Sequence, residues 1–206
     1  MARRLAPKVN AGSMADIAFL LLVFFLVSTT IETDYGISRK LPPPPPKENI
    51  EPDLIREKNL FRVELNQFNE LLVERKLLQL KDLRAAAIAF LDNGGGVNNE
   101  SCAYCNGLRD PKSSDNPTKA VISLINSRET NYETYVSVQN ELVAAYAELR
   151  DREAIRIYQV SYRQMKSYLK DVNYSGNKAL LKEQIKEIQS MYPEKLSEAE
   201  PVETSL

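Results

Sequence analysis

The feature that most constrains this chain is an apolar run close to its N-terminus. Residues 14–31 carry a single ionisable side chain, that of Asp16, and residues 17–27 are apolar without a break. Because a bilayer-spanning helix needs roughly 20 mostly apolar residues, we expect residues 12–31 to cross a membrane. The alternatives are a cleaved signal peptide and a buried core helix. The acidic residue in the run disfavours the first, and apolar side chains on every face disfavour the second.

The charges that flank the run predict its orientation. Residues 1–11 carry three basic side chains and no acidic one, whereas Glu32 and Asp34 follow the run. Lys and Arg favour the cytoplasmic side of a membrane. We therefore expect residues 1–11 to form a cytoplasmic head and residues 32–206 to lie on the opposite side.

A proline-rich segment separates the expected membrane helix from the rest of the chain. Residues 42–46 are five consecutive prolines, and such a run favours an extended polyproline II conformation. We expect residues 32–58 to be a linker. Both a plain spacer and a docking strip for a partner fit this composition.

Residues 59–206 carry the patterns of a small α+β domain with short strands and two or three longer helices. Alternating apolar and polar residues predict strands, and apolar residues three or four positions apart predict helices. The strands are expected at 61–65, 71–74, 120–125 and near 196, and the helices at 80–92, 131–149 and 178–190. A polar, turn-rich stretch at 93–118 predicts a long loop. Residues 155–170 fit either a helix or a strand.

The composition excludes most classes of enzyme. The chain contains no histidine, seven glycines and two cysteines, and its net charge is −1. Without histidine it lacks the usual general base near neutral pH and the commonest metal ligand. Two cysteines are too few for a four-cysteine zinc site, and the charge balance gives no case for nucleic-acid binding. We therefore expect no enzymatic activity, no cofactor, no metal site and no nucleic-acid partner.

The two cysteines form a C-x-x-C motif, Cys102-Ala-Tyr-Cys105, inside the expected loop. Three interpretations stay open: a local disulfide that staples the loop, a redox-active pair, and a share in a metal site. The turn-rich setting lacks the strand and helix start of a thioredoxin-like site. An oxidising compartment favours the disulfide.

Asp16 is the residue best suited to chemistry. A carboxylate on a membrane helix is costly and marks a functional site by default, and a carboxyl group that is neutral when dry and ionised when wet can relay protons. Helical spacing puts Gly12, Asp16 and Thr30 on one face, and the small Gly12 lets another helix approach. Asn10 and Ser13 add polar groups at the cytoplasmic end. Alternatively, Asp16 lies near the helix start, where the helix dipole favours an anion.

The segment NAGSMADIAFLLLVFF, residues 10–25, resembles the start of the ExbD/TolR family of bacterial biopolymer-transport proteins. In that family an asparagine lies six residues before a membrane aspartate, as Asn10 lies before Asp16, and an apolar run follows. A short basic head, one membrane helix and a periplasmic α+β domain also agree. Ser13 departs from the proline that many members carry.

The resemblance covers about residues 3–150, and an extension at 151–206 lies beyond it. It implies a subunit of a proton-motive-force-driven motor in the bacterial inner membrane, with Asp16 as the proton-carrying group. The implied partners are ExbB-like (TolQ/MotA-like) polytopic membrane subunits, a second copy of the chain and a periplasmic TonB-like protein. A TolR-like role in the Tol-Pal envelope system is the alternative within the family, and some relatives are linked to peptidoglycan.

Two hypotheses from other functional classes remain. A passive membrane-anchored module would bind the cell wall or envelope proteins and would not need Asp16. A periplasmic thiol oxidoreductase would need Cys102 and Cys105. The segment around Asp16 favours the motor, and the lack of other catalytic groupings disfavours the oxidoreductase.

Overall fold

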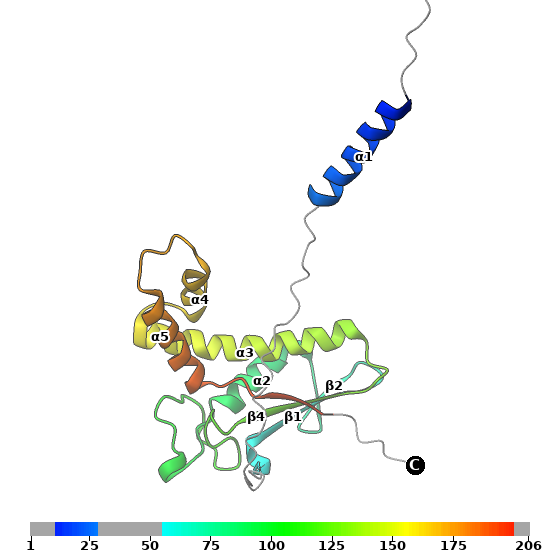
Figure 1. Cartoon of the computed structure of the whole chain (residues 1–206). Helices are drawn as coiled ribbons and strands as arrows, with labels where there is room; N and C mark the ends of the chain where they lie inside the picture. Colours follow the sequence, from blue (N-terminus) through cyan, green and yellow to red (C-terminus); the bar gives the residue numbers. More distant parts are fainter. Residues whose placement is uncertain (1–10, 29–54, 200–206) are drawn as a thin grey trace, which may run out of the picture. The chain divides into compact units, whose positions relative to one another are not determined.

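The computed structural model describes residues 11–28 and 55–199 (Figure 1). The expected head and most of the expected linker fall outside these residues, and so do the candidate residues Asn10 and Thr30. Among the described residues, no helix has both the length and the apolar character that crossing a membrane requires.

The chain divides into two compact units, residues 1–50 and 51–206. Helix α1 (Ala11–Ser28) is the described element of the first unit. The second unit is an α+β domain, as the sequence predicts. Its described residues contain a five-stranded sheet and the helices α2 to α5.

The sheet of the second unit is mixed, with the strand order β3-β2-β1-β4-β5. Its strands are β1 (Leu60–Leu65), β2 (Leu71–Val73), β3 (Lys76–Leu78), β4 (Val121–Asn126) and β5 (Leu196–Ala199). Strands β1, β2 and β3 form an antiparallel meander. Strand β1 also pairs in parallel with β4, which pairs in parallel with β5. Each parallel pair needs a crossover, and helices supply both of them.

Strand β3 is absent from the sequence-based prediction. Its turn consists of Glu74 and Arg75, whose φ angles are 48° and 64°. Two-residue hairpin turns with two positive φ angles favour Asn-Gly or Asp-Gly. Because neither residue carries that signal, the second hairpin was not foreseen.

The helices of the second unit differ in what they cover. They are α2 (Leu80–Leu91), α3 (Tyr132–Tyr158), α4 (Tyr162–Lys170) and α5 (Lys178–Met191), with short 3₁₀ turns η1 (Glu57–Asn59) and η2 (Asn98–Glu100). Helices α2 and α3 pack on one face of the sheet. Alternate residues of β1 are buried there, and Val63, Leu83, Ile122 and Leu142 have no exposed surface. A stack of Phe61 on Phe90 adds to this main core.

The region that the sequence left ambiguous, residues 155–170, is helical on both sides of a break. Helix α3 continues to Tyr158, and Gln159 then takes a left-handed conformation with φ of 58°. Ser161 caps α4, because its hydroxyl accepts a 3.2 Å hydrogen bond from the amide of Gln164. Helices α4 and α5 enclose a second, smaller core with the end of α3, in which Met165 and Ile188 are buried.

Candidate functional site

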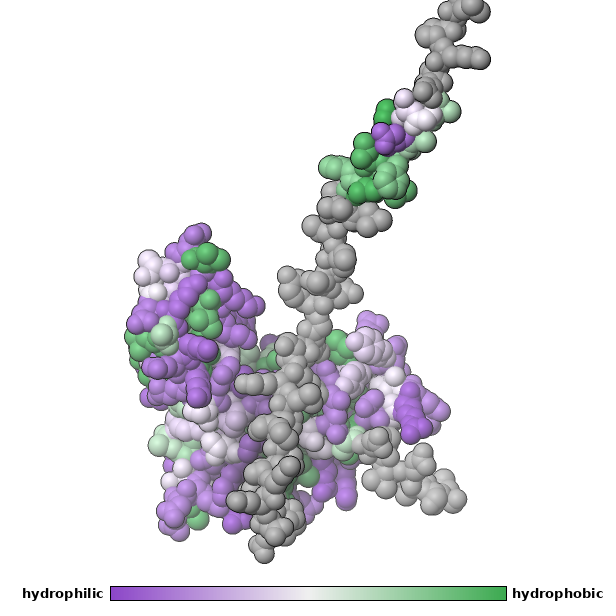
Figure 2. Space-filling model, in the orientation of Figure 1, coloured by the Kyte–Doolittle hydropathy of each residue, from purple (hydrophilic) through white to green (hydrophobic). Residues whose placement is uncertain are grey.

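Helix α1 presents apolar side chains all round its axis. Asp16 is its single ionisable residue. The large apolar side chains are exposed, from 40% for Val23 to 65% for Phe19, and Figure 2 shows hydrophobic residues over most of the helix. A helix that is apolar on every side needs lipid or other protein to cover it.

Asp16 lies in the second turn of α1, beyond the first turn, which holds no acidic residue. The helix dipole acts on an anion mainly within the first turn, so this position does not favour the interpretation of Asp16 as a helix-start carboxylate. Gly12 lies one turn earlier on the same face, and Gly12, Ser13 and Asp16 are all exposed. Helix α1 itself contains no basic side chain that could pair with Asp16.

Several polar side chains of the second unit meet at Asp92, the buried residue directly after α2. Arg152 donates two hydrogen bonds to its carboxylate, at 2.6 and 2.8 Å. The Tyr192 hydroxyl donates a third at 2.7 Å, and the amide of Asn106 donates a fourth at 3.2 Å. Asp92 is 4% exposed. One carboxylate thus joins α2, α3, the loop at 93–118 and the end of α5. We call Asp92 and these hydrogen-bond partners the Asp92 junction.

The acidic residue next to Arg152 is paired as well. Glu153 is 1% exposed and accepts hydrogen bonds from Arg152 at 3.1 Å and from Arg156 at 2.7 Å. Hydrogen bonds to Asp92 raise the pKa of Arg152, so its guanidinium stays charged. The junction is therefore a set of ion pairs around one charged guanidinium.

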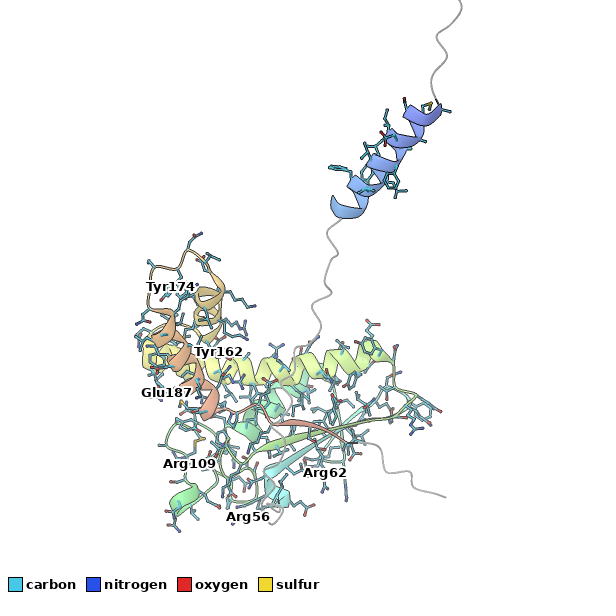
Figure 3. All side chains as sticks on the ribbon, viewed as in Figure 1. Arg56, Arg62, Arg109, Tyr162, Tyr174 and Glu187 are labelled. Atoms are coloured by element: carbon cyan, nitrogen blue, oxygen red, sulfur yellow. A yellow bond between two sulfur atoms is a disulfide. The ribbon has the colours of Figure 1, made fainter. Side chains whose placement is uncertain are left out.

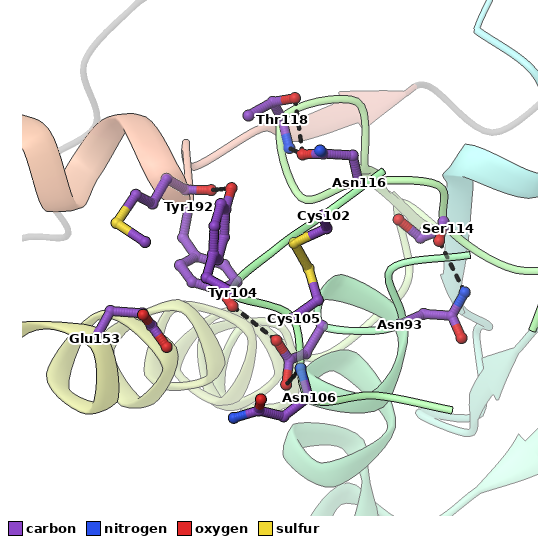
Figure 4. The surroundings of a disulfide bond; sticks show 12 residues. Asn93, Cys102, Tyr104, Cys105, Asn106, Ser114, Asn116, Thr118, Glu153 and Tyr192 are labelled. Carbon is purple, nitrogen blue, oxygen red and sulfur yellow. Dashed lines mark hydrogen bonds between the residues drawn. A yellow bond between two sulfur atoms is a disulfide. The ribbon is translucent and has the colours of Figure 1, made fainter. Parts of the chain in front are cut away.

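Cys102 and Cys105 are joined by a disulfide, and both are buried (Figure 4). Tyr104 lies between them in the sequence. Its hydroxyl donates a 2.8 Å hydrogen bond to the carbonyl of Met191, and its ring meets that of Tyr192 edge-on with centroids 5.4 Å apart. The disulfide loop therefore contacts the end of α5 directly.

The tyrosines at this contact are held in their neutral form. Burial, with the nearby carboxylates of Glu153 and Asp92, raises the pKa of Tyr104 to about 12. Burial and the hydrogen bond to Asp92 raise the pKa of Tyr192 as well. Neither phenol is activated as a nucleophile or base, which agrees with a structural role.

Hydrogen bonds fix the loop at 93–118 to the rest of the domain at several points. Asn93 donates from its amide to the carbonyls of Asp110 and Ser114, at 2.9 and 2.8 Å. Asp115, whose side chain is 1% exposed, accepts from Lys58 at 2.5 Å and from Asn59 at 3.1 Å. Gly94 has a φ of 65°, and a Cβ there would lie 2.7 Å from that of Cys105. The loop is thus a packed part of the domain.

The contacts described above are hydrogen bonds, ion pairs and a disulfide that join parts of the domain. Among the described residues, no three His, Cys, Asp or Glu side chains are placed to hold a metal ion. The sequence reasoning missed the Asp92 junction, because its members are 60 and 100 positions apart in the chain. No local pattern marks such distant partners.

The family assignment rests on a comparison over most of the chain. The family model described as biopolymer transport protein ExbD/TolR matches residues 2–150. The chain belongs to the ExbD/TolR family. The match agrees closely with the resemblance seen in the sequence at residues 3–150. A search of curated protein sequences finds no match.

The ExbD/TolR match covers only part of the described structure. It includes α1 and the domain from β1 through most of α3. The rest of α3, the helices α4 and α5 and the last strand β5 lie beyond it. The Asp92 junction spans this boundary, since Asp92 lies inside the match and Arg152 and Tyr192 lie outside.

Proposed function

We propose that this chain is an ExbD-like subunit of an inner-membrane motor driven by the proton motive force. Residues 12–31 anchor it as a single membrane span with the N-terminus in the cytoplasm, and the domain at 59–206 lies in the periplasm. Asp16 is the proton-carrying group. The chain performs no enzymatic reaction and uses no cofactor.

The observation that supports this proposal most is the position of Asp16. It is the single ionisable residue of α1 and lies one turn from Gly12, in a chain that belongs to the ExbD/TolR family. A proton that crosses the membrane releases about 2.3 kcal/mol per 100 mV. Because neutral and charged carboxyl groups prefer different surroundings, proton transfer at Asp16 can bias a packed helix between two positions.

The proposal includes specific partners. ExbB-like, TolQ/MotA-like polytopic subunits surround α1 and a second copy of the chain. This assembly covers the exposed apolar side chains of α1. Asn10, Gly12, Ser13 and Thr30 support the packing and polarity around Asp16. The periplasmic domain passes the movement to a TonB-like protein, which energises outer-membrane transport.

The experiment compares Asp16→Asn with the wild-type chain in mild-detergent co-purification and in uptake that depends on the proton motive force. Asparagine keeps the shape of the side chain and removes the titratable proton. We expect both forms to bring down the same polytopic partner and only the variant to lose uptake. Asp82→Asn is the matched control, because Asp82 is an exposed carboxylate in the first turn of α2.

Normal uptake by the Asp16→Asn variant would overturn the motor. If, in addition, no membrane partner co-purifies, the second candidate applies: a passive membrane-anchored module that binds the envelope or the peptidoglycan. The observation that favours this candidate is that the second unit has its own core.

The family description also covers TolR, so a TolR-like subunit of the Tol-Pal system is the alternative within the motor class. A TolR-like chain co-purifies with a TolQ-like subunit, and its loss weakens the envelope. An ExbD-like chain co-purifies with an ExbB-like subunit, and its loss abolishes uptake of outer-membrane nutrients. Detergent sensitivity and uptake measured on one deletion strain separate the two.

A further inference from the structure

The hairpin of α4 and α5 has no counterpart in the family match, which ends at residue 150. Its helices close against each other and against the end of α3 through the smaller core. Figure 3 shows the pair standing out from the end of α3, with Tyr174 in the connecting segment. The hairpin therefore lies outside the part of the chain that the family match covers.

Basic residues dominate the hairpin from Val160 to Lys182. This stretch contains five basic residues and one acidic residue, Asp171, and the rest of α5 adds Lys186, Glu183 and Glu187. Arg163 is paired with Asp151 at 2.9 Å, and Lys178 donates to the carbonyl of Asp171. The other three lysines, which we call the collar, are Lys166, Lys170 and Lys182.

All three collar lysines are exposed, and none forms an ion pair within residues 55–199. Lys166 and Lys170 are four positions apart on α4, as Lys178 and Lys182 are on α5. Like charges at this spacing destabilise a helix, so the arrangement works against the stability of the hairpin. An anionic partner would relieve that repulsion.

Apolar and aromatic side chains lie at the same end of the hairpin. Val172 is 90% exposed, in a segment whose other exposed residues are polar or small, and Leu180 in the first turn of α5 is 52% exposed. The Asp171 carboxylate accepts a 2.8 Å hydrogen bond from the amide of Asn173, which fixes the turn around Val172. Tyr168 and Tyr174 stack with centroids 4.9 Å apart. We call residues 168–182 the tip.

We propose that the tip and the collar bind the surface of a bilayer that contains anionic phospholipids. The headgroup layer of a bilayer binds surfaces that combine exposed apolar side chains, aromatic rings and lysines. The lysine stems lie along apolar surface, and their charged ends contact the phosphates. Figure 2 shows hydrophobic residues among hydrophilic ones on this hairpin.

The proposed membrane anchor makes such binding effective even if it is weak. Residues 29–54 separate α1 from the domain, and a segment of that length reaches at most about 90 Å when fully extended. The domain therefore stays at a high effective concentration next to the bilayer. This second contact would hold the domain against the membrane and limit its reach, independently of proton transfer at Asp16.

The test places an environment-sensitive fluorophore on Val172→Cys in the full chain. The native cysteines are joined in a disulfide, so the new thiol is the labelled one. The labelled chain is reconstituted into nanodiscs of phosphatidylcholine alone or mixed equally with phosphatidylglycerol. We expect a blue shift of the emission in the anionic discs, which salt reverses. The same label on Leu108→Cys, a residue that is 93% exposed in the loop at 93–118, should not shift.

Matched charge variants assign the effect to the collar. Each lysine close to an anionic surface strengthens binding about fivefold, so Lys166→Gln, Lys170→Gln and Lys182→Gln together should weaken it on the order of 100-fold. The control replaces three exposed lysines elsewhere in the domain, with Lys76→Gln, Lys81→Gln and Lys112→Gln. It removes the same charge and should leave the shift unchanged.

Several outcomes would overturn the proposal. These are an equal shift in neutral discs, an equal loss in both triple variants, and collar-dependent binding to purified peptidoglycan without any lipid effect. A chain that cannot be reconstituted would count against the membrane anchor alone. In that case, co-sedimentation of the same labelled chain with preformed phosphatidylglycerol vesicles still decides the hairpin proposal.

Discussion

Tyr192, the residue after α5, donates a 2.7 Å hydrogen bond to Asp92, the residue after α2. Arg152 of α3 binds both side chains, at 2.8 Å to each oxygen. The part of the chain beyond the family match is therefore joined to the part within it by buried, charge-assisted hydrogen bonds. Such bonds are roughly twice as strong as neutral ones.

The first prediction concerns this bond. Tyr192→Phe should lower the free energy of unfolding by about 1–3 kcal/mol, because Asp92 and Arg152 each lose a buried partner. Denaturant unfolding of the intact chain, followed by circular dichroism, measures the change. Tyr168→Phe is the control, since the Tyr168 hydroxyl accepts from Gln164 at an exposed site. Equal losses of unfolding free energy in the two variants would show that the buried Tyr192 hydrogen bond stabilises the fold no more than the exposed one of Tyr168.

The second prediction concerns the disulfide. Replacing Cys102 and Cys105 together with alanine should destabilise the folded loop at 93–118 by about 2 kcal/mol, the loop-closure term for so short a loop. The effect should be local. Hydrogen exchange should accelerate at the amides of Gly95 and Gly96, which bond to the carbonyls of Ser114 and Asp115.

Strands β1 and β4 provide the internal reference for that exchange experiment. Their pairing does not involve the loop, so their protection should persist in the double variant. A uniform acceleration over the whole domain would mean that the disulfide supports the global fold instead of the loop alone.

The third prediction concerns acid stability. Burial raises the pKa of Asp115, but hydrogen bonds from Lys58 and Asn59 together with the charges of Lys58 and Arg56 lower it by more. The net pKa therefore lies below its usual value. A lowered pKa in the folded state stabilises the fold above the unfolded pKa, about 3.9, and this contribution disappears as the pH falls through the folded pKa. Asp115→Asn should therefore lose stability at pH 7 and show a weaker acid dependence below pH 4.

The control for acid stability is Asp82→Asn. Asp82 is exposed and forms no ion pair within the part of the chain that the structure describes. The unfolding free energies at pH 7 and pH 3 should change less in this variant than in Asp115→Asn. An unchanged pH dependence in Asp115→Asn would contradict the assigned role of the Lys58 and Asn59 hydrogen bonds.

The fourth prediction compares two helix caps of the same residue type. The Asn177 side chain accepts hydrogen bonds from the amides of Ala179 and Leu180 at the start of α5, whereas Asn131 caps α3 without a side-chain bond. Asn177→Ala should cost about 1 kcal/mol, and Asn131→Ala should cost less. Thermal unfolding of the two variants measures the difference, and the reverse order would refute the assigned geometry.

Much of the domain follows from local patterns in the sequence. The apolar spacing from Val138 to Leu149 predicted the buried face of α3, and these positions are buried as expected. The run at 120–125 predicted β4, which spans Val121–Asn126. Such elements succeed because one face of each packs against the main core, and that requirement leaves a period in the sequence.

Other features leave no such trace. The second hairpin turn uses Glu74 and Arg75 in a conformation that their residue types do not indicate. The sequence also does not indicate that α3 ends at Gln159, because this residue adopts a left-handed conformation without being Gly or Asn. The Asp92 junction depends on tertiary contacts alone. In α1, the resemblance to the family singles out Asp16, and its role as a proton-carrying group stays a prediction.

The parallel pairing of β5 with β4 has a consequence for how the domain forms. The chain must make α3, α4 and α5 before the strand that lies beside β4 exists. Sheets with such distant pairings fold slowly, and until β5 is in place the backbone of β4 remains an open edge that another strand can occupy. Until that pairing forms, a strand from a second copy of the chain can therefore take the place of β5 beside β4.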